Sequence, residues 1–261
     1  MGDRVAIVTG AASGIGRAAA ELLVAQGGSV VAVDLDVERL AWATHDERIV
    51  VLAGDVCSPE TNAEMVATAL EHFGRLDAVA LNAGIPMSGD LVDLPIERFD
   101  RVMEVNVRAV LLGIRAVVPA FRKAGRGGRI VVTASTSGLA GDPSMWPYNT
   151  SKGAVINLVR ATALDLAAEG ITVNAVCPGP TETGMTAGLV AMPAVHEALR
   201  AQIPAQRWGS PDEIAAVIAF LASAASSFVT GVAIPVDGGI TASTGQFRPR
   251  MRPLDQQGEP S

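Results

Sequence analysis

Residues 5–16 of the chain read VAIVTGAASGIG, a β-branched run that passes through a glycine-rich turn into a helical pattern. Glycine lets the backbone turn sharply and approach a ligand closely, and the start of a helix offers N–H groups and partial positive charge. A turn of this kind between a strand and a helix predicts a site for the phosphates of a dinucleotide. The residues predicted to hold them are Gly10, Ser13, Gly14, Ile15 and Gly16.

Outward from this turn, short apolar runs alternate with helical patterns. The runs are continuous rather than alternating, as expected for parallel strands covered by helices on both faces. The expected strands are 5–9, 29–33, 49–53, 78–81, 130–133, 172–176 and 232–236, and the expected helices are 15–26, 60–73, 96–123, 148–169 and 211–222. The order predicts an α/β fold, a doubly wound, Rossmann-type, mainly parallel seven-stranded sheet with right-handed crossovers.

One domain is expected over residues 1–243, because no linker or repeat divides the chain. Residues 181–209 are rich in Met, Pro and small residues and follow the carboxyl end of a strand. We interpret them as a lid over the substrate, with a plain surface excursion as the alternative. The tail, residues 244–261, does not resemble core sequence; disorder and packing across a subunit interface both remain open.

Composition excludes several classes of function. The 261 residues carry a net charge of −7, which does not favour a nucleic-acid binder. The two cysteines are far apart and the histidines are scattered, so we expect no disulfide, no redox motif and no metal site. The apolar stretches are too short or too interrupted to span a bilayer, and a strand begins almost at once. We expect a cytoplasmic protein with no membrane or nucleic-acid partner.

The second strand ends at Asp34, about twenty residues after the turn. A carboxylate at this place accepts hydrogen bonds from the ribose hydroxyls of adenosine and repels a 2′-phosphate. Leu35 and Asp36 follow, and no arginine stands beside them. The sequence therefore favours NAD over NADP.

A tyrosine and a lysine stand four residues apart at the start of a predicted helix, at Tyr148 and Lys152. Positions i and i+4 share a helix face, so the phenol and the ammonium are directed into the same space. Ser135 lies just beyond the predicted strand 130–133. Strand end and helix start are expected to meet at the carboxyl edge of the sheet, beside the nucleotide.

Taken together, these motifs resemble those of the short-chain dehydrogenase/reductases over about residues 4–241. Further matching motifs are Asp55-Val56, Asn82-Ala83-Gly84, Asn106, Ser135-x-x-Gly138, Pro178-Gly179 and Val236-Asp237-Gly238-Gly239. The resemblance implies that Asp55 and Val56 line the adenine pocket and that residues 82–84 lie near the nicotinamide ribose. It also implies that Pro178, Gly179, Thr181 and Thr183 contact the nicotinamide side.

The resemblance implies hydride transfer between a secondary alcohol or ketone and NAD(H). Tyr148 would act as general acid and base, with its pKa lowered by Lys152 and by the oxidised nicotinamide. Lys152 would also bind the nicotinamide ribose, and Ser135 would hold the substrate oxygen. Asn106 would anchor a water in a proton relay. Ser137 competes with Ser135, but only Ser135 has the motif's spacing to Gly138 and Tyr148.

Several apolar residues are candidates for a substrate pocket: Trp146, Met185, Leu189, Met192 and Trp208. An adaptable apolar pocket would suit a cyclic or medium-chain secondary alcohol better than a sugar. Ordinary lid packing is the alternative.

Two other functions and an assembly state complete the expectations. A 3-oxoacyl-carrier-protein-type ketoreductase would use the basic residues Arg122, Lys123, Arg126 and Arg129 to dock an acidic carrier, although such enzymes usually take NADPH. A nucleotide-binding module without activity would lack part of the catalytic set.

Helices 96–123 and 148–169 carry more apolar surface than one sheet face needs, and the resemblance implies a homotetramer.

Overall fold

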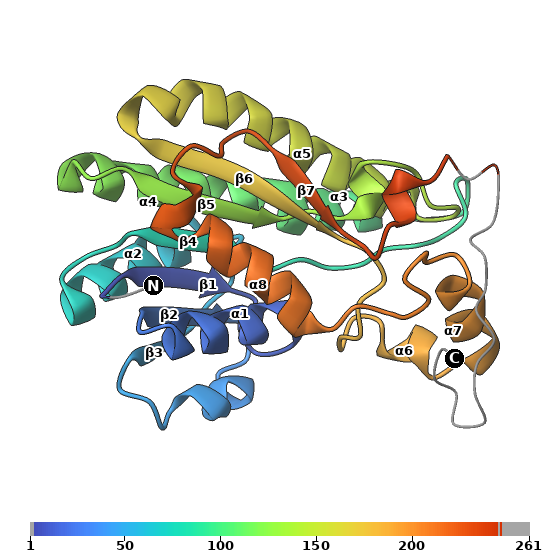
Figure 1. The fold of residues 1–261 in the computed structure, drawn as a ribbon, viewed down its shortest axis with the longest axis horizontal. Helices are drawn as coiled ribbons and strands as arrows, with labels where there is room; N and C mark the ends of the chain where they lie inside the picture. The colour runs from blue at the N-terminus through green and yellow to red at the C-terminus, as the bar shows by residue number, and fades with distance from the viewer. Residues whose placement is uncertain (1–2, 245, 247–261) are drawn as a thin grey trace.

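In the computed structural model, which describes residues 3–244 and 246, all the strands lie parallel in one sheet (Figure 1). They are β1 (Val5–Thr9), β2 (Ser29–Asp34), β3 (Ile49–Ala53), β4 (Ala78–Leu81), β5 (Gly128–Thr133), β6 (Ile171–Pro178) and β7 (Ala233–Val236). Their order, β3-β2-β1-β4-β5-β6-β7, confirms the predicted seven-stranded, doubly wound sheet within the described residues. The chain reverses direction across the sheet between β1 and β4, where ligands bind in open α/β sheets.

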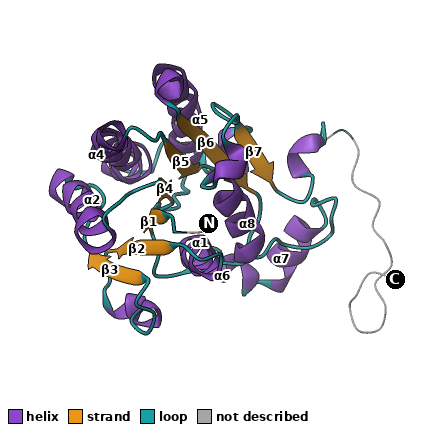
Figure 2. Cartoon of the chain, turned by 60° about the vertical axis from the view of Figure 1, so that its left-hand side comes forward, coloured by secondary structure: helices purple, strands orange, loops and turns teal. Residues whose placement is uncertain are grey.

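Helices cover the two faces of the sheet as separate layers (Figure 2). One layer holds α1 (Gly14–Ala25) and α8 (Pro211–Leu221); the other holds α2 (Pro59–Phe73), α4 (Ala109–Ala124) and α5 (Trp146–Leu166). Successive side chains of a strand point to opposite faces. In β1, Ala6 and Val8 pack towards α1 and α8, and Ile7 packs towards α2, α4 and α5. Both faces are therefore buried, which explains the continuous apolar runs.

The predicted helix 96–123 is helical throughout, but it contains a π-helical turn that the sequence did not predict. It is divided into α3 (Ile96–Met103), a π-helical turn η2 (Glu104–Arg108) and α4. A π turn inserts one extra residue and often marks a functional site. Here it contains Asn106, whose amide bonds to both backbone groups of Ile85, accepting from N–H at 2.9 Å and donating to C=O at 3.0 Å.

Residues 181–209 leave the sheet at its carboxyl edge, directly after β6. They carry two short helices, α6 (Ala187–Val190) and α7 (Pro193–Arg200), which lie together at one end of the molecule (Figure 1). A β-bridge between Thr181 and Gly209 closes the base of the segment. The excursion is thus a helical flap with joined ends rather than an irregular loop.

Short 3-10 turns complete the described secondary structure. They are η1 (Glu38–Ala43), η3 (Thr136–Gly138), η4 (Ala167–Glu169), η5 (Ala224–Ser226) and η6 (Ile240–Ala242). No helix in the described ranges is long and apolar enough to cross a membrane. The predicted tail, 244–261, lies outside the described residues apart from positions 244 and 246.

Candidate active site

The glycine-rich turn packs tightly against the end of β4. Gly10 and Gly14 have φ of +69° and +54°, a backbone conformation that favours glycine. A Cβ on Gly10 would lie 2.9 Å from Asn82 Nδ2 and 3.0 Å from Ala83 Cα. Ser13 precedes α1 but makes no side-chain capping bond, so the N–H groups of the first helical turn stay available for an anion. The turn therefore has the shape and the donors that a pyrophosphate needs.

The base of the flap faces the same turn. A Cβ on Gly14 would lie 3.3 Å from Thr183 Cβ and 3.3 Å from its methyl group. Thr181 Oγ1 donates to Gly179 O at 2.9 Å, which fixes the chain where it leaves β6. The residues assigned to the nicotinamide side thus stand across from those assigned to the phosphates.

Asp34 ends β2 beside the turn. Its Oδ2 accepts from Ala12 N at 2.9 Å and its Oδ1 from Leu35 N at 2.8 Å. The carboxylate is held beside the glycine-rich turn, and each oxygen keeps a further lone pair for a hydroxyl donor.

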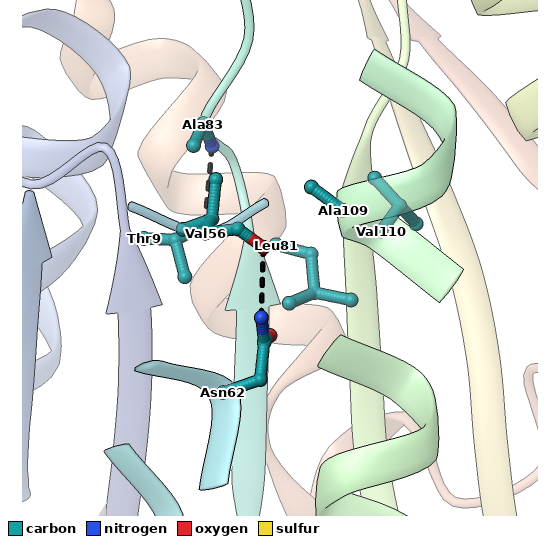
Figure 3. Close-up of a pocket in the computed structure, with 7 residues that line it drawn as sticks. All are labelled: Thr9, Val56, Asn62, Leu81, Ala83, Ala109 and Val110. Carbon is teal, nitrogen blue, oxygen red and sulfur yellow. Dashed lines mark hydrogen bonds between the residues drawn. The ribbon is translucent and has the colours of Figure 1, made fainter. Parts of the chain in front are cut away.

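A small cavity lies between β1, β4 and α4 (Figure 3). Its lining residues are Thr9, Val56, Asn62, Leu81, Ala83, Ala109 and Val110. Asn62 Nδ2 donates to Val56 O at 2.7 Å, and Ala83 N donates to Thr9 Oγ1 at 3.1 Å. Beside Val56, Asp55 accepts from Cys57 N at 2.9 Å, which lowers the pKa of this carboxyl. These bonds fix the two segments assigned to the adenine and to the nicotinamide ribose.

Tyr148, Lys152 and Ser135 meet at the carboxyl edge of the sheet, as the spacing predicts. Ser135 follows β5, and its hydroxyl acts on the Tyr148 phenol, whose pKa it lowers. Lys152 Nζ lies 5.6 Å from the centre of the Tyr148 ring and donates to Thr133 O at 2.8 Å. The phenol and the ammonium therefore share one space beside the ends of β4 and β5.

Asn106 belongs to the same cluster. A Cβ on Gly84 would lie 3.2 Å from Asn106 Oδ1 and 3.5 Å from Lys152 Nζ. Asn106 Nδ2 also donates to Ser151 Oγ at 3.0 Å. The amide is committed to bonds within the protein that tie η2 to β4 and α5. Sequence reasoning missed Ser151, since a helical serine beside a motif carries no signal of its own.

Burial sets the pKa of both residues of the pair. It raises the pKa of Tyr148; the hydrogen bond to Ser135 opposes this increase, and the charge of Asp142 adds to it. Burial lowers the pKa of Lys152 to about 8. The protein without its cofactor therefore does not lower the pKa of Tyr148 as expected. The loss of water disfavours phenolate and ammonium alike.

The candidate pocket residues separate into two groups. Trp146 stacks on Phe99 of α3, with ring centres 5.6 Å apart, and Met185, Leu189 and Met192 of the flap stay 40–48% exposed. Trp208 is buried, and its ring lies 5.0 Å from that of His196, to whose carbonyl it donates. Trp208 is thus a packing residue of the flap, and we do not retain it as a pocket residue.

The basic residues near the end of α4 differ in exposure and in partners. Arg122 pairs with Glu169 at 2.6 Å, and Arg126 lies 4.0 Å from Asp77. Arg129 is buried and donates to the carbonyls of Ser223 and Gly128. Arg129 therefore does not contribute to a shared basic surface, whereas Arg122, Lys123 and Arg126 remain exposed.

Comparison with known proteins identifies the family. A family model described as enoyl-(acyl carrier protein) reductase matches residues 10–241. The 2-(R)-hydroxypropyl-CoM dehydrogenase of Xanthobacter autotrophicus is 41% identical, over 92% of this chain and 99% of its own length. The chain belongs to the short-chain dehydrogenase/reductase family.

Other relatives of this short-chain dehydrogenase/reductase agree. The meso-2,3-butanediol dehydrogenase of Serratia marcescens is 37% identical over 94% of this chain and 97% of its own length. The crystal structure of levodione reductase, 33% identical, has a TM-score of 0.88 and covers 93% of this chain and 99% of its own. A further solved structure, 32% identical, contains bound NADP. This short-chain dehydrogenase/reductase is an oxidoreductase acting on CH–OH groups with a nicotinamide cofactor.

Proposed function

We propose that this enzyme interconverts a secondary alcohol and a ketone with NAD(H), using Tyr148 as the general acid and base. One observation carries the proposal: Ser135, Tyr148 and Lys152 meet at the carboxyl edge of the sheet, with Lys152 Nζ next to Gly84, which follows β4. The bound dinucleotide supplies or accepts the hydride.

The side chains of the site divide the remaining work. Tyr148 donates its proton to the carbonyl oxygen in reduction and takes it from the hydroxyl in oxidation. Ser135 donates a hydrogen bond to the same oxygen and stabilises charge as it develops there. Lys152, which bonds to Thr133 in the chain alone, binds the nicotinamide ribose and favours phenolate. Asn106 supports a water in the proton path from Lys152.

Asp34 supports NAD rather than NADP. The carboxylate stands at the end of β2 and is fixed by backbone N–H groups of Ala12 and Leu35. A 2′-phosphate would place a second negative charge beside it. A solved structure of similar fold contains bound NADP, so the carboxylate of Asp34 is the feature of this chain on which the proposal of NAD rests.

An apolar wall supports a secondary alcohol of modest size as substrate. Trp146 stacks on Phe99, and Met185, Leu189 and Met192 of the flap carry exposed side chains. Such a wall fits a cyclic or medium-chain alcohol. The family model's name concerns acyl-carrier substrates, and the ketoreductase of that type remains the alternative; the burial of Arg129 and the carboxylate of Asp34 speak against it.

We also propose a homotetramer located in the cytoplasm. Apolar side chains remain exposed on α4 and α5 (Leu111 and Leu164) and, separately, at the α8–β7 edge (Phe220 and Phe228). Two distinct apolar faces suit an assembly with two kinds of interface. The two free cysteines fit a reducing compartment.

Tyr148→Phe tests the proposed function. This substitution removes the proton donor and keeps the ring, so turnover of a ketone panel with NADH should fall by about 10²–10⁴-fold. NADH binding, measured by fluorescence titration, should stay within about twofold. Turnover equal to that of the unmodified enzyme would refute the assignment of Tyr148.

A further inference from the structure

A carboxylate outside the proposed catalytic set lies at the rim of the site. Asp142 belongs to the loop between η3 and α5 and is exposed. Its Oδ2 accepts from Ser137 Oγ at 2.5 Å, and its backbone carbonyl accepts from Asn149 Nδ2 at 2.9 Å. The side chain is therefore anchored to η3 and its backbone to the first turn of α5.

Hydrogen bonds connect this carboxylate to the reacting centre. Ser137 N donates to Ser135 Oγ at 3.1 Å. Ser137 therefore links Asp142 to the hydroxyl that is assigned to the substrate oxygen. The charge of Asp142 also contributes to the raised pKa of Tyr148, which places it within electrostatic range of the phenol. Through Ser137, and by its charge, the carboxylate of Asp142 is linked to the residues assigned to the substrate oxygen.

Asp142 retains acceptor capacity. Among the described residues it has no ion-pair partner, and its Oδ1 accepts no hydrogen bond. A carboxylate oxygen can accept two hydrogen bonds, so a donor on a ligand has a partner available. The loop is itself held in place, because Gly89 N donates to Ser144 O at 2.9 Å. A held carboxylate with one open oxygen is suited to recognition.

We propose that Asp142, anchored by Ser137, determines specificity by accepting a hydrogen bond from a hydroxyl or ammonium group next to the reacting carbon. This inference rests on the proposed alcohol–ketone chemistry. It selects vicinal diols, α-hydroxyketones and amino alcohols over plain alcohols of the same size. It disfavours substrates with a carboxylate at that place, because two like charges would be brought together.

The test uses matched ketone pairs with the full-length enzyme. The pairs are butanone with 3-hydroxybutan-2-one and cyclohexanone with 2-hydroxycyclohexanone, each assayed with NADH and with NADPH. The unmodified enzyme should prefer the hydroxyketone in kcat/KM. Asp142→Asn keeps an acceptor for Ser137 but removes the charge, and should reduce that preference about tenfold, since bonds to charged groups are the stronger ones. In Asp142→Asn, kcat/KM for acetoacetate, which carries a carboxylate, should instead increase relative to kcat/KM for butanone.

Matched variants separate recognition from damage to the fold. Ser137→Ala frees the carboxylate and should reduce the same preference by less. Asp165→Asn, an equal charge change on an exposed residue near the other end of α5, should leave every ratio unchanged. A variant that lost activity on both members of each pair equally would show a merely structural role and overturn the inference.

The outcomes also separate this inference from the proposed function. If the enzyme reduces the plain ketones and Asp142→Asn leaves its preference for hydroxyketones unchanged, the specificity role of Asp142 is overturned. The alcohol–ketone assignment then stands. No reduction of any ketone with either dinucleotide overturns both.

Discussion

Burial disfavours the charged form of both Tyr148 and Lys152. The pKa of the phenol is raised, and that of the ammonium is lowered to about 8. Ser135, after β5, lowers the pKa of the phenol and Asp142, in the loop before α5, raises it, while Lys152 Nζ lies 5.6 Å from the centre of the ring. Lys152 is in turn influenced by Cys177 of β6, which lies behind it. A base that works near neutrality therefore depends on the positive charge of the bound oxidised cofactor.

The raised pKa of Tyr148 predicts opposite pH profiles for the two directions. Alcohol oxidation needs phenolate, so kcat/KM should increase with pH from about 7 to about 10, while ketone reduction should decrease. Asp142→Asn removes a negative charge that raises this pKa, and should move the oxidation profile to lower pH. Steady-state rates across this range provide the measurement, and identical profiles for the two directions would contradict the assignment.

Asp34 gives a second prediction at the scale of one residue. Asp34→Asn removes the charge and leaves an acceptor for Ala12 N, so the ratio of kcat/KM for NADPH to that for NADH should increase by at least about tenfold. Glu71→Gln, an exposed acid on α2, is the matched control and should leave the ratio unchanged. An unaltered ratio in Asp34→Asn would place cofactor selection elsewhere.

At the scale of elements, close approaches between backbone segments shape the site. The turn before α1 packs on the end of β4, and the π turn before α4 places the Asn106 amide between β4 and α5. Neither approach tolerates an added atom well. Gly16 is the tightest of these positions, since a Cβ there would overlap the carbonyl of Gly10.

Gly16→Ala should therefore displace the glycine-rich turn. We expect a loss of stability of about 1–3 kcal/mol from overpacking and weaker NADH binding. Chemical denaturation and fluorescence titration measure the two effects. Gly184→Ala is the control, because a Cβ there has no neighbour within 4 Å and should change neither quantity much. Normal binding by Gly16→Ala would show that the turn does not contact the dinucleotide.

At the scale of the whole molecule, two sides of the chain remain apolar. β7 is an edge strand of the sheet, and Phe228, which precedes it, is fully exposed. Leu164, in the last turn of α5, is 82% exposed. An open strand edge and an apolar helix face both favour association.

Light scattering after size exclusion should therefore give a mass about four times that of the 26.8 kDa chain. Phe228→Asp places a charge at the α8–β7 edge and should reduce the assembly to a dimer that keeps the other interface. A monomer for the unmodified chain would contradict the tetramer.

Much of the site was predictable because its residues follow the order of the elements. A continuous β-branched run before Gly10 predicts a buried strand, and a phenol and an ammonium four residues apart predict a shared helix face. Parallel strands bring their carboxyl ends to one edge, so the positions of Asp34 and Ser135 follow from the predicted strands, whereas residues 82–84 were assigned through the family resemblance. Local pattern and chain direction thus determined the fold and the family motifs.

Tertiary structure alone decided what depends on contacts between distant segments. The bond between Ser137 and Asp142, the π turn at Asn106 and the internal use of Arg129 all arise from packing that no local pattern encodes. The raised pKa of Tyr148 has the same origin. The sequence places a proton donor beside a lysine, but how much water reaches that pair, and which carboxylate faces it, depends on how the whole chain closes around them.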